Sequence, residues 1–211
     1  MKGKLLGMVL AALLLVMAGC GGGNDGHRLI ETRIPSDVAV DADIVNAGGV
    51  LTVTRASTVD GIFAGVDPVN DDVYRAFLHF PLTTVPLNAR IRSAELGIVI
   101  RSVTVLPPTA TIPIWIELVS FDPPVVASDF DRTLLLPLES VSISPPISSA
   151  DVNREVVVDV TPLMVEAQLR GLRFFQVRIF QESDFTTPVP GLIEIDESTQ
   201  ENAPLLTVVY D

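Results

Sequence analysis

Short runs of alternating apolar and polar residues recur along most of the chain, with turn-forming residues between them. The run 74–80 places Ala76, Leu78 and Phe80 on one face, and the run 93–105 does the same with four aliphatic residues. Alternation of period two with one apolar face is typical of antiparallel strands that pack face to face. The runs predicted as strands are 50–55, 74–80, 93–105, 112–121, 155–160, 174–181, 192–196 and 205–210.

One segment departs from this alternation and predicts a single short helix. Thr161 is a candidate N-cap, and Pro162 follows at the first helical position, where its missing N–H costs nothing. Gly171 can end the helix in a left-handed conformation. Many short strands and one helix together predict an all-β protein, an antiparallel jelly-roll-like β-sandwich.

The first twenty residues have the layout of a secretory leader. Lys2 and Lys4 precede an apolar run, and small residues follow it immediately before Cys20, the only cysteine of the chain. The run is shorter than the roughly 20 apolar residues that a transmembrane helix needs. The ending resembles the lipobox of bacterial lipoproteins, in which the cysteine becomes the acylated N-terminus.

Several expectations follow from that resemblance. Residues 1–19 are a lipoprotein signal peptide, and Cys20 is the lipidation site, carrying acyl chains such as palmitate. Gly21, and not aspartate, follows the cysteine, which resembles the sorting signal for the outer membrane in Gram-negative bacteria. We therefore expect a lipid-anchored protein of the cell envelope. A plain cleavable signal peptide is the alternative, but it leaves a lone cysteine unexplained.

The composition of the chain after the leader restricts the partners that it can bind and the number of domains that it can form. Both lysines lie in the leader, so 12 arginines remain against 26 acidic residues, a formal charge of −14. Such a charge repels nucleic acid, which we exclude as a partner. The glycine-rich start of residues 20–33 predicts a flexible tether, and residues 34–211 fit one β-domain.

Three groups of residues resemble one known family. Arg75, Leu78, Phe80 and Leu82, followed by Ile91, Ala94 and Leu96, are similar to the opening motif of DNRLRE-type domains; residues 158–161 resemble their "D-V-T" element, and residues 204–210 resemble their closing strand. The similarity extends over about residues 38–211. It implies a jelly-roll β-sandwich of secreted and surface proteins, some of whose members are regarded as carbohydrate-binding modules.

Trp115 and Glu117 are the candidate carbohydrate-binding residues. Both lie on the face of the run 112–121 opposite its aliphatic residues, where an indole ring can stack on a sugar and a carboxylate can accept hydrogen bonds from hydroxyls. The alternative is that Trp115 fills a core or is covered by the long segment 122–146.

An acidic loop is a weak candidate for structural calcium, and no other cofactor is expected. Asp67, Asn70, Asp71 and Asp72 supply oxygen atoms of the kind that calcium prefers, but their spacing does not match an EF-hand. A solvated turn is the simpler interpretation.

No catalytic motif is present in the sequence. The chain has two histidines, and it contains neither G-x-S-x-G nor H-E-x-x-H. Carboxylates are plentiful, but nothing singles out a pair for glycoside hydrolysis.

We therefore expect a non-catalytic surface lipoprotein that acts as a binding or scaffold module, with a polysaccharide or an envelope protein as its partner. A carbohydrate-binding module is the alternative, and a glycan-active enzyme is a third. Arg75 is expected to be structural, with Asp159 as a candidate partner.

Overall fold

The computed structural model describes residues 28–182 and 189–211, and within them the chain forms twelve β-strands, four short 3-10 turns and one α-helix, α1 (Thr161–Leu169). The strands are β1 (Ile30–Pro35), β2 (Ala42–Ala47), β3 (Val50–Arg55), β4 (Gly61–Val66), β5 (Val73–Pro81), β6 (Ile91–Val105), β7 (Ile114–Val119), β8 (Glu139–Ser142), β9 (Arg154–Asp159), β10 (Phe174–Gln181), β11 (Gly191–Asp196) and β12 (Leu205–Tyr210).

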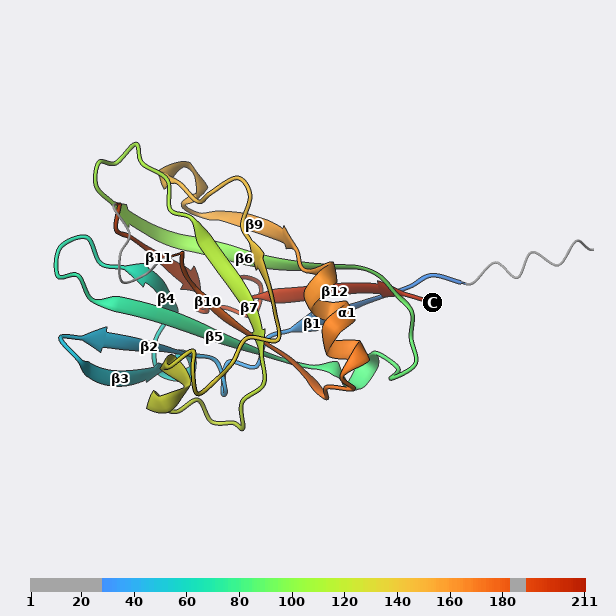
Figure 1. The fold of residues 1–211 in the computed structure, drawn as a ribbon. Coiled ribbons are helices and arrows are strands. Elements are labelled where there is room, and N and C mark those ends of the chain that lie inside the picture. The colour runs from blue at the N-terminus through green and yellow to red at the C-terminus, as the bar shows by residue number, and fades with distance from the viewer. Residues whose placement is uncertain (1–27, 183–188) are drawn as a thin grey trace, which may run out of the picture.

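The strands form one curled sheet, and all the pairings between strands of the described residues are antiparallel. Its order is β1-β12-β6-β11-β4-β5-β10-β7-β8, while β2 pairs with both β3 and β5, and β9 pairs with β6. The sheet curls until the half that contains β6 and β12 faces the half that contains β5, β10 and β7 (Figure 1). The predicted all-β, sandwich-like fold with one helix is therefore confirmed.

The main core lies between these two halves and is built from the faces that the alternation predicted. Ala76, Leu78 and Phe80 of β5 are buried there. The opposing and neighbouring strands add Ala94, Leu96, Ile98 and Ile100 of β6, Ile114, Ile116 and Leu118 of β7, and Phe175, Val177 and Ile179 of β10. Side chains from both inner faces interdigitate, as they do in β-sandwiches.

A second, smaller core covers the opposite face of the same central strands. Phe77 of β5 and Val119 of β7 pack there against Phe121, Val125 and Phe130 of the segment that follows β7. Strands β5, β10 and β7 are therefore buried on both faces, whereas in a simple sandwich one face of each strand would be exposed to solvent.

Several strand boundaries differ from the sequence prediction. β3, β10 and β12 match it, whereas β1, β2, β4 and β8 were not predicted. Alanine, glycine, asparagine and aspartate, which have low strand propensity, make up much of β2 and β4, and tertiary pairing overrides that preference. The structure also corrects the expected tether, because β1 begins at Ile30 and pairs with β12 from that residue onward.

The helix lies where the sequence places it, but its N-cap is Val160 and not Thr161. The backbone N–H of Thr161 donates to the Asp159 carboxylate over 2.9 Å, and its hydroxyl accepts a hydrogen bond from the backbone N–H of Ala94. Gly171 has a φ of +64°, as predicted for the residue that ends the helix. In the described parts of the chain, no helix is long and apolar enough to cross a membrane.

The surroundings of Arg75 differ from the expectation, in which Asp159 was its candidate partner. The Arg75 side chain is buried, donates to the carbonyl oxygen of Phe130, and lies 4.1 Å from the centre of the Phe130 ring. Asp159 lies in β9, which pairs with β6. A structural role fits this burial, but the partner is Phe130 of residues 120–138, the covering segment between β7 and β8, and not Asp159.

A fully buried ion pair joins two of the central strands. Glu117 of β7 lies directly opposite Arg178 of β10, and one of its carboxylate oxygens accepts from Nε at 3.0 Å and from Nη2 at 2.6 Å. The other oxygen pairs with Arg132 of the covering segment. Since an unpaired charge is costly in a protein interior, these contacts hold the covering segment against the sheet.

We predict that Glu117→Gln lowers the free energy of unfolding by about 3 kcal/mol, because it leaves the buried Arg178 charge uncompensated. Urea denaturation measures the loss. Glu139→Gln removes an exposed carboxylate from the neighbouring strand β8 and serves as the control, with an expected effect below about 0.5 kcal/mol. Equal stabilities for the two variants would contradict this role of the ion pair.

Candidate functional site

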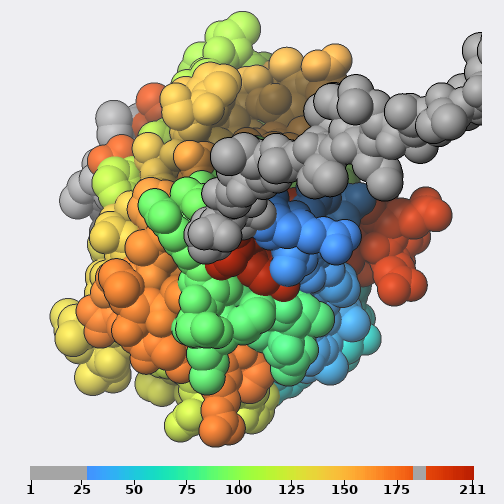
Figure 2. All heavy atoms as spheres, turned by 90° about the vertical axis from the view of Figure 1, so that its right-hand side faces the viewer, coloured from blue at the N-terminus to red at the C-terminus, as the bar shows by residue number. Residues whose placement is uncertain are grey.

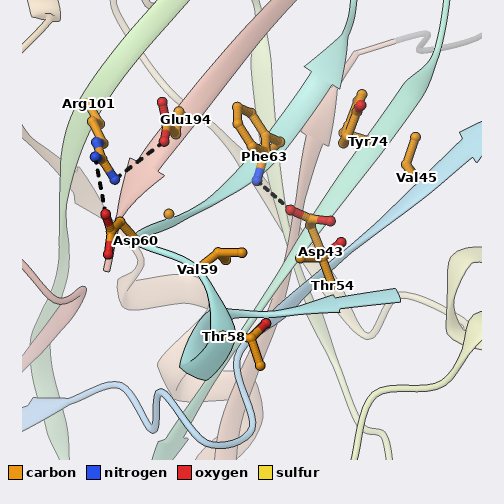
Figure 3. Close-up of a pocket in the computed structure, with 11 residues that line it drawn as sticks. Asp43, Val45, Thr54, Thr58, Val59, Asp60, Phe63, Tyr74, Arg101 and Glu194 are labelled. Carbon is orange, nitrogen blue, oxygen red and sulfur yellow. Dashed lines mark hydrogen bonds and ion pairs between the residues drawn. The ribbon is translucent and has the colours of Figure 1, made fainter. Parts of the chain in front are cut away.

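A solvent-facing groove of about 520 Å³ lies on the side of the sheet where β2, β4, β5, β6 and β11 come together (Figure 3). Residues 58–60, from the turn between β3 and β4, form one of its edges. The side chains that give it chemical character are Asp43, Asp60, Phe63, Tyr74, Arg101 and Glu194.

Two aromatic side chains form the apolar part of this groove. Phe63 of β4 and Tyr74 of β5 are both half-buried, and their ring centres lie 5.6 Å apart with the planes inclined by 56°. Gly65 lets β4 approach β11 beside them, since it has a φ of +118° and any Cβ there would clash with the carbonyl oxygen of Gly191. The aromatic pair is thus carried by strands and not by a loop.

Charged side chains form the wall on the other side. Arg101 of β6 lies between two carboxylates, with Nη2 3.5 Å from Asp60 and Nη1 3.6 Å from Glu194 (Figure 3). Glu194 also accepts a hydrogen bond of 2.8 Å from the hydroxyl of Ser102. The hydrogen bond from Ser102 orients the Glu194 carboxylate, and the guanidinium of Arg101 lies within reach of both acidic groups.

Asp43 is the most deeply buried polar residue of the groove. Its carboxylate accepts a 3.0 Å hydrogen bond from the backbone N–H of Phe63. Burial raises the pKa of Asp43 to about 6, although this bond and one with the side chain of Thr54 oppose the shift. Near neutral pH this carboxyl can therefore accept hydrogen bonds as the anion and can also take up a proton.

The groove combines the features that recognise a polyhydroxylated ligand. Aromatic faces give apolar contact with the C–H groups of such a ligand. Carboxylates accept hydrogen bonds from its hydroxyls, and the guanidinium donates hydrogen bonds to them. Asp43, Asp60 and Glu194 face only Arg101 as a cation within the lining. This excess of negative charge favours a neutral or cationic ligand over an anionic one.

Trp115 and Glu117 lie in different surroundings from this groove. Trp115 is half-buried in β7, opposite Phe180 and Ser142 in the neighbouring strands. Glu117 lies on the same face of β7 as Trp115, as the alternation predicts, but it is buried and its carboxylate pairs with Arg132 and Arg178. The expectation that Glu117 accepts hydrogen bonds from a sugar does not fit this arrangement, while sugar stacking on Trp115 stays a prediction.

The acidic loop 67–72 forms a turn between β4 and β5. One oxygen of Asp67 accepts from the backbone N–H of Val69 at 2.8 Å, and the other accepts from the Asn70 amide at 3.1 Å. Across residues 28–182 and 189–211, no group of three or more histidine, cysteine, aspartate or glutamate residues is arranged to hold a metal ion. Calcium at Asp67, Asn70, Asp71 and Asp72 stays a prediction. Cys20 and the leader lie outside the described residues.

A second acidic feature is buried beside the turn that follows β11. Asp41 and Glu197 interact with each other, and Asp41 also accepts a 2.7 Å hydrogen bond from the backbone N–H of His79. Burial and the neighbouring carboxylate raise the pKa of Asp41 to about 9, and burial raises the pKa of Glu197 to about 7. The pair therefore retains at least one proton at neutral pH.

Sequence reasoning missed all six polar and aromatic groove residues, because they come from five strands and one turn that only the fold brings together. Tyr74 and Arg101 lie inside predicted strands, but alternation assigns a residue to a face without identifying what lies beside it. No model of a known protein family matches the chain, and no curated protein matches it.

We predict that Asp41→Asn stabilises the protein increasingly as pH rises. The raised pKa means that the folded state holds more protons than the unfolded state between the ordinary pKa of 3.8 and about 9, so the stability of the natural protein falls across that interval. The amide needs no proton and still accepts from His79. Urea denaturation should show a gain of at least about 1 kcal/mol near pH 8 and little gain near pH 4.

Glu201→Gln is the matched control, because it removes an exposed carboxylate near the same turn. If both variants change the pH dependence equally, general charge repulsion, and not the buried pair, sets the pH dependence.

Proposed function

We propose that this chain is a non-catalytic binding module of the cell envelope, anchored by lipid at Cys20, and that it binds a carbohydrate in the groove of Phe63 and Tyr74. The observation that carries the ligand class is the pair of strand-borne aromatic rings beside oriented carboxylates and a guanidinium. Apolar contact and convergent polar groups are what a small-molecule site requires.

The sequence supports the envelope part of this proposal. A positive start, an apolar run and small residues before Cys20 are typical of an exported lipoprotein, and Gly21 fits an outer-membrane destination. The resemblance to DNRLRE-type domains, some regarded as carbohydrate-binding modules, supports the same ligand class.

A scaffold module without a sugar ligand is the second candidate. The observation that favours it is the environment of β7, where Trp115 is half-buried and Glu117 is enclosed by Arg178 and Arg132. If the protein only makes contacts with other proteins, substitutions in the Phe63–Tyr74 groove should not affect its function.

Binding to a glycan array should identify the ligand, and Tyr74→Ala should weaken that binding roughly tenfold or more, since the ring supplies apolar contact worth at least about 1.4 kcal/mol. Tyr74→Phe retains the ring and should keep most of the affinity. Trp115→Ala should bind as the natural protein does. Thermal unfolding establishes that each variant is folded.

Three results would contradict the proposed site or the proposed non-catalytic function. Binding abolished by Trp115→Ala alone would move the site to β7. The absence of binding to any glycan would favour the scaffold candidate. Cleavage of a bound glycan would assign the protein to the enzymes.

Replacement of Cys20 by serine should abolish incorporation of labelled palmitate and release the protein from the membrane fraction, because the proposed anchor is attached to that sulfur. Labelling and membrane retention that survive Cys20→Ser would contradict the lipid anchor.

A further inference from the structure

One end of the domain gathers the start of β1, the segment after β5, the end of α1 and the last residues of the chain. Figure 2 shows this end, with β1 in blue beside the green segment 82–90 and the orange helix. Ile30 is paired with Tyr210, whose hydroxyl donates to the carbonyl of Thr84, and the Gln168 side chain donates to the carbonyl of Pro86.

This end exposes large apolar side chains. Leu87 is 73% exposed, Leu169 is 77% exposed and Leu29 is 61% exposed, while Phe174 borders a hollow of about 510 Å³ together with Leu87. Single exposed apolar residues elsewhere on the molecule are normal. This set differs because four chain segments bring its members to one end, where Leu87 and Phe174 line the hollow.

The same end is rich in arginine, although the protein as a whole is acidic; Glu31, Glu166 and Asp211 also lie there, and Glu166 pairs with Arg170. Segments 82–94 and 167–181 contain no aspartate or glutamate, in a chain that has 26 of them. Exposed arginines accompany the apolar residues at positions 28, 90, 170 and 173. Apolar side chains with arginines around them suit the interface of a bilayer, where arginine attracts anionic headgroups.

The point at which the chain enters the domain also favours a bilayer as the partner of this end. Seven residues lie between Cys20 and Arg28, the first described residue, and the eight Cα–Cα steps that join them can span at most about 28 Å. Any anchor at Cys20 therefore keeps this end of the domain closer to the membrane than the rest of it.

We propose that the tether-end surface, defined as Leu29, Leu87, Leu169 and Phe174 with Arg28, Arg90, Arg170 and Arg173, rests on the phospholipid bilayer that holds the Cys20 acyl chains. This inference rests on the proposed lipid anchor. The domain then stands upright, because β5 and β6 run away from this surface.

The upright orientation presents the groove outward. Tyr74 lies seven residues along β5 from Pro81 at the tether end, and Arg101 lies ten residues along β6 from Ile91. At the rise of a β-strand these separations are about 23 Å and about 33 Å. The bilayer therefore leaves the groove open to the surrounding solution.

Spin labels at single cysteines test this contact in the lipidated full chain, reconstituted into vesicles of phosphatidylethanolamine and phosphatidylglycerol. Because acylation blocks Cys20, an introduced cysteine is the only free thiol. Leu87→Cys and Leu169→Cys report on the tether end. Val69→Cys is the control, since Val69 is 75% exposed in the turn between β4 and β5.

Labels at positions 87 and 169 should collide with a dissolved nickel chelate roughly tenfold less often than the label at position 69, and more often with oxygen, because they lie among the headgroups and acyl chains. Equal nickel accessibility at all three positions overturns the proposal. Shielding that persists in dilute detergent, without a bilayer, overturns it in favour of a second copy of the chain.

Mass analysis of the reconstituted protein separates the two levels of the argument. An acylated Cys20 with water-exposed labels refutes the membrane contact alone. A Cys20 without acyl chains refutes the lipid anchor, and the membrane contact falls with it.

Discussion

The burial of β5, β10 and β7 on both faces is the constraint on which the rest of the structure depends. One face of each strand adds aliphatic side chains to the main core, while the other carries Arg75, Arg178 and Glu117. Charges in that position require partners, and Glu117 meets the requirement by accepting from Arg178 and pairing with Arg132. The long segment after β7 is therefore part of the folded domain and not a free loop.

The same constraint places the groove away from the covered face of β7 and β10. The covering segment lies over β7 and β10, so the half-buried Trp115 belongs to a surface that other parts of the chain border closely. Phe63 and Tyr74 lie farther along the sheet, at the meeting of β4 with β5, where the groove remains open to solvent. Their rings are positioned by strand pairing, which limits the ordering that a ligand must impose.

Alternation in the sequence was enough to predict the inner faces of β5, β6 and β7, because burial on one side of a pleated strand leaves a period of two. It failed for β2 and β4, whose alanine, glycine and polar residues give no such pattern. It also placed Glu117 on the correct face and assigned it the wrong surroundings, since the partner Arg178 lies 61 residues away in the chain. The groove could not be predicted for the same reason: Asp43, Phe63 and Glu194 become neighbours only through pairing between distant strands.

The groove and the arginine-rich apolar end lie in different parts of the domain and give it a direction. The chain enters at the end that carries the apolar surface, and the polar and aromatic groove lies along the strands away from it. The most direct test of this account is a nuclear magnetic resonance titration of the domain with a glycan identified by the array. The account predicts that the signals of Thr54, Phe63, Tyr74 and Arg101 shift together while those of Trp115 and Ser142 stay constant. Shifts centred on Trp115, with Phe63 and Tyr74 unaffected, would contradict it.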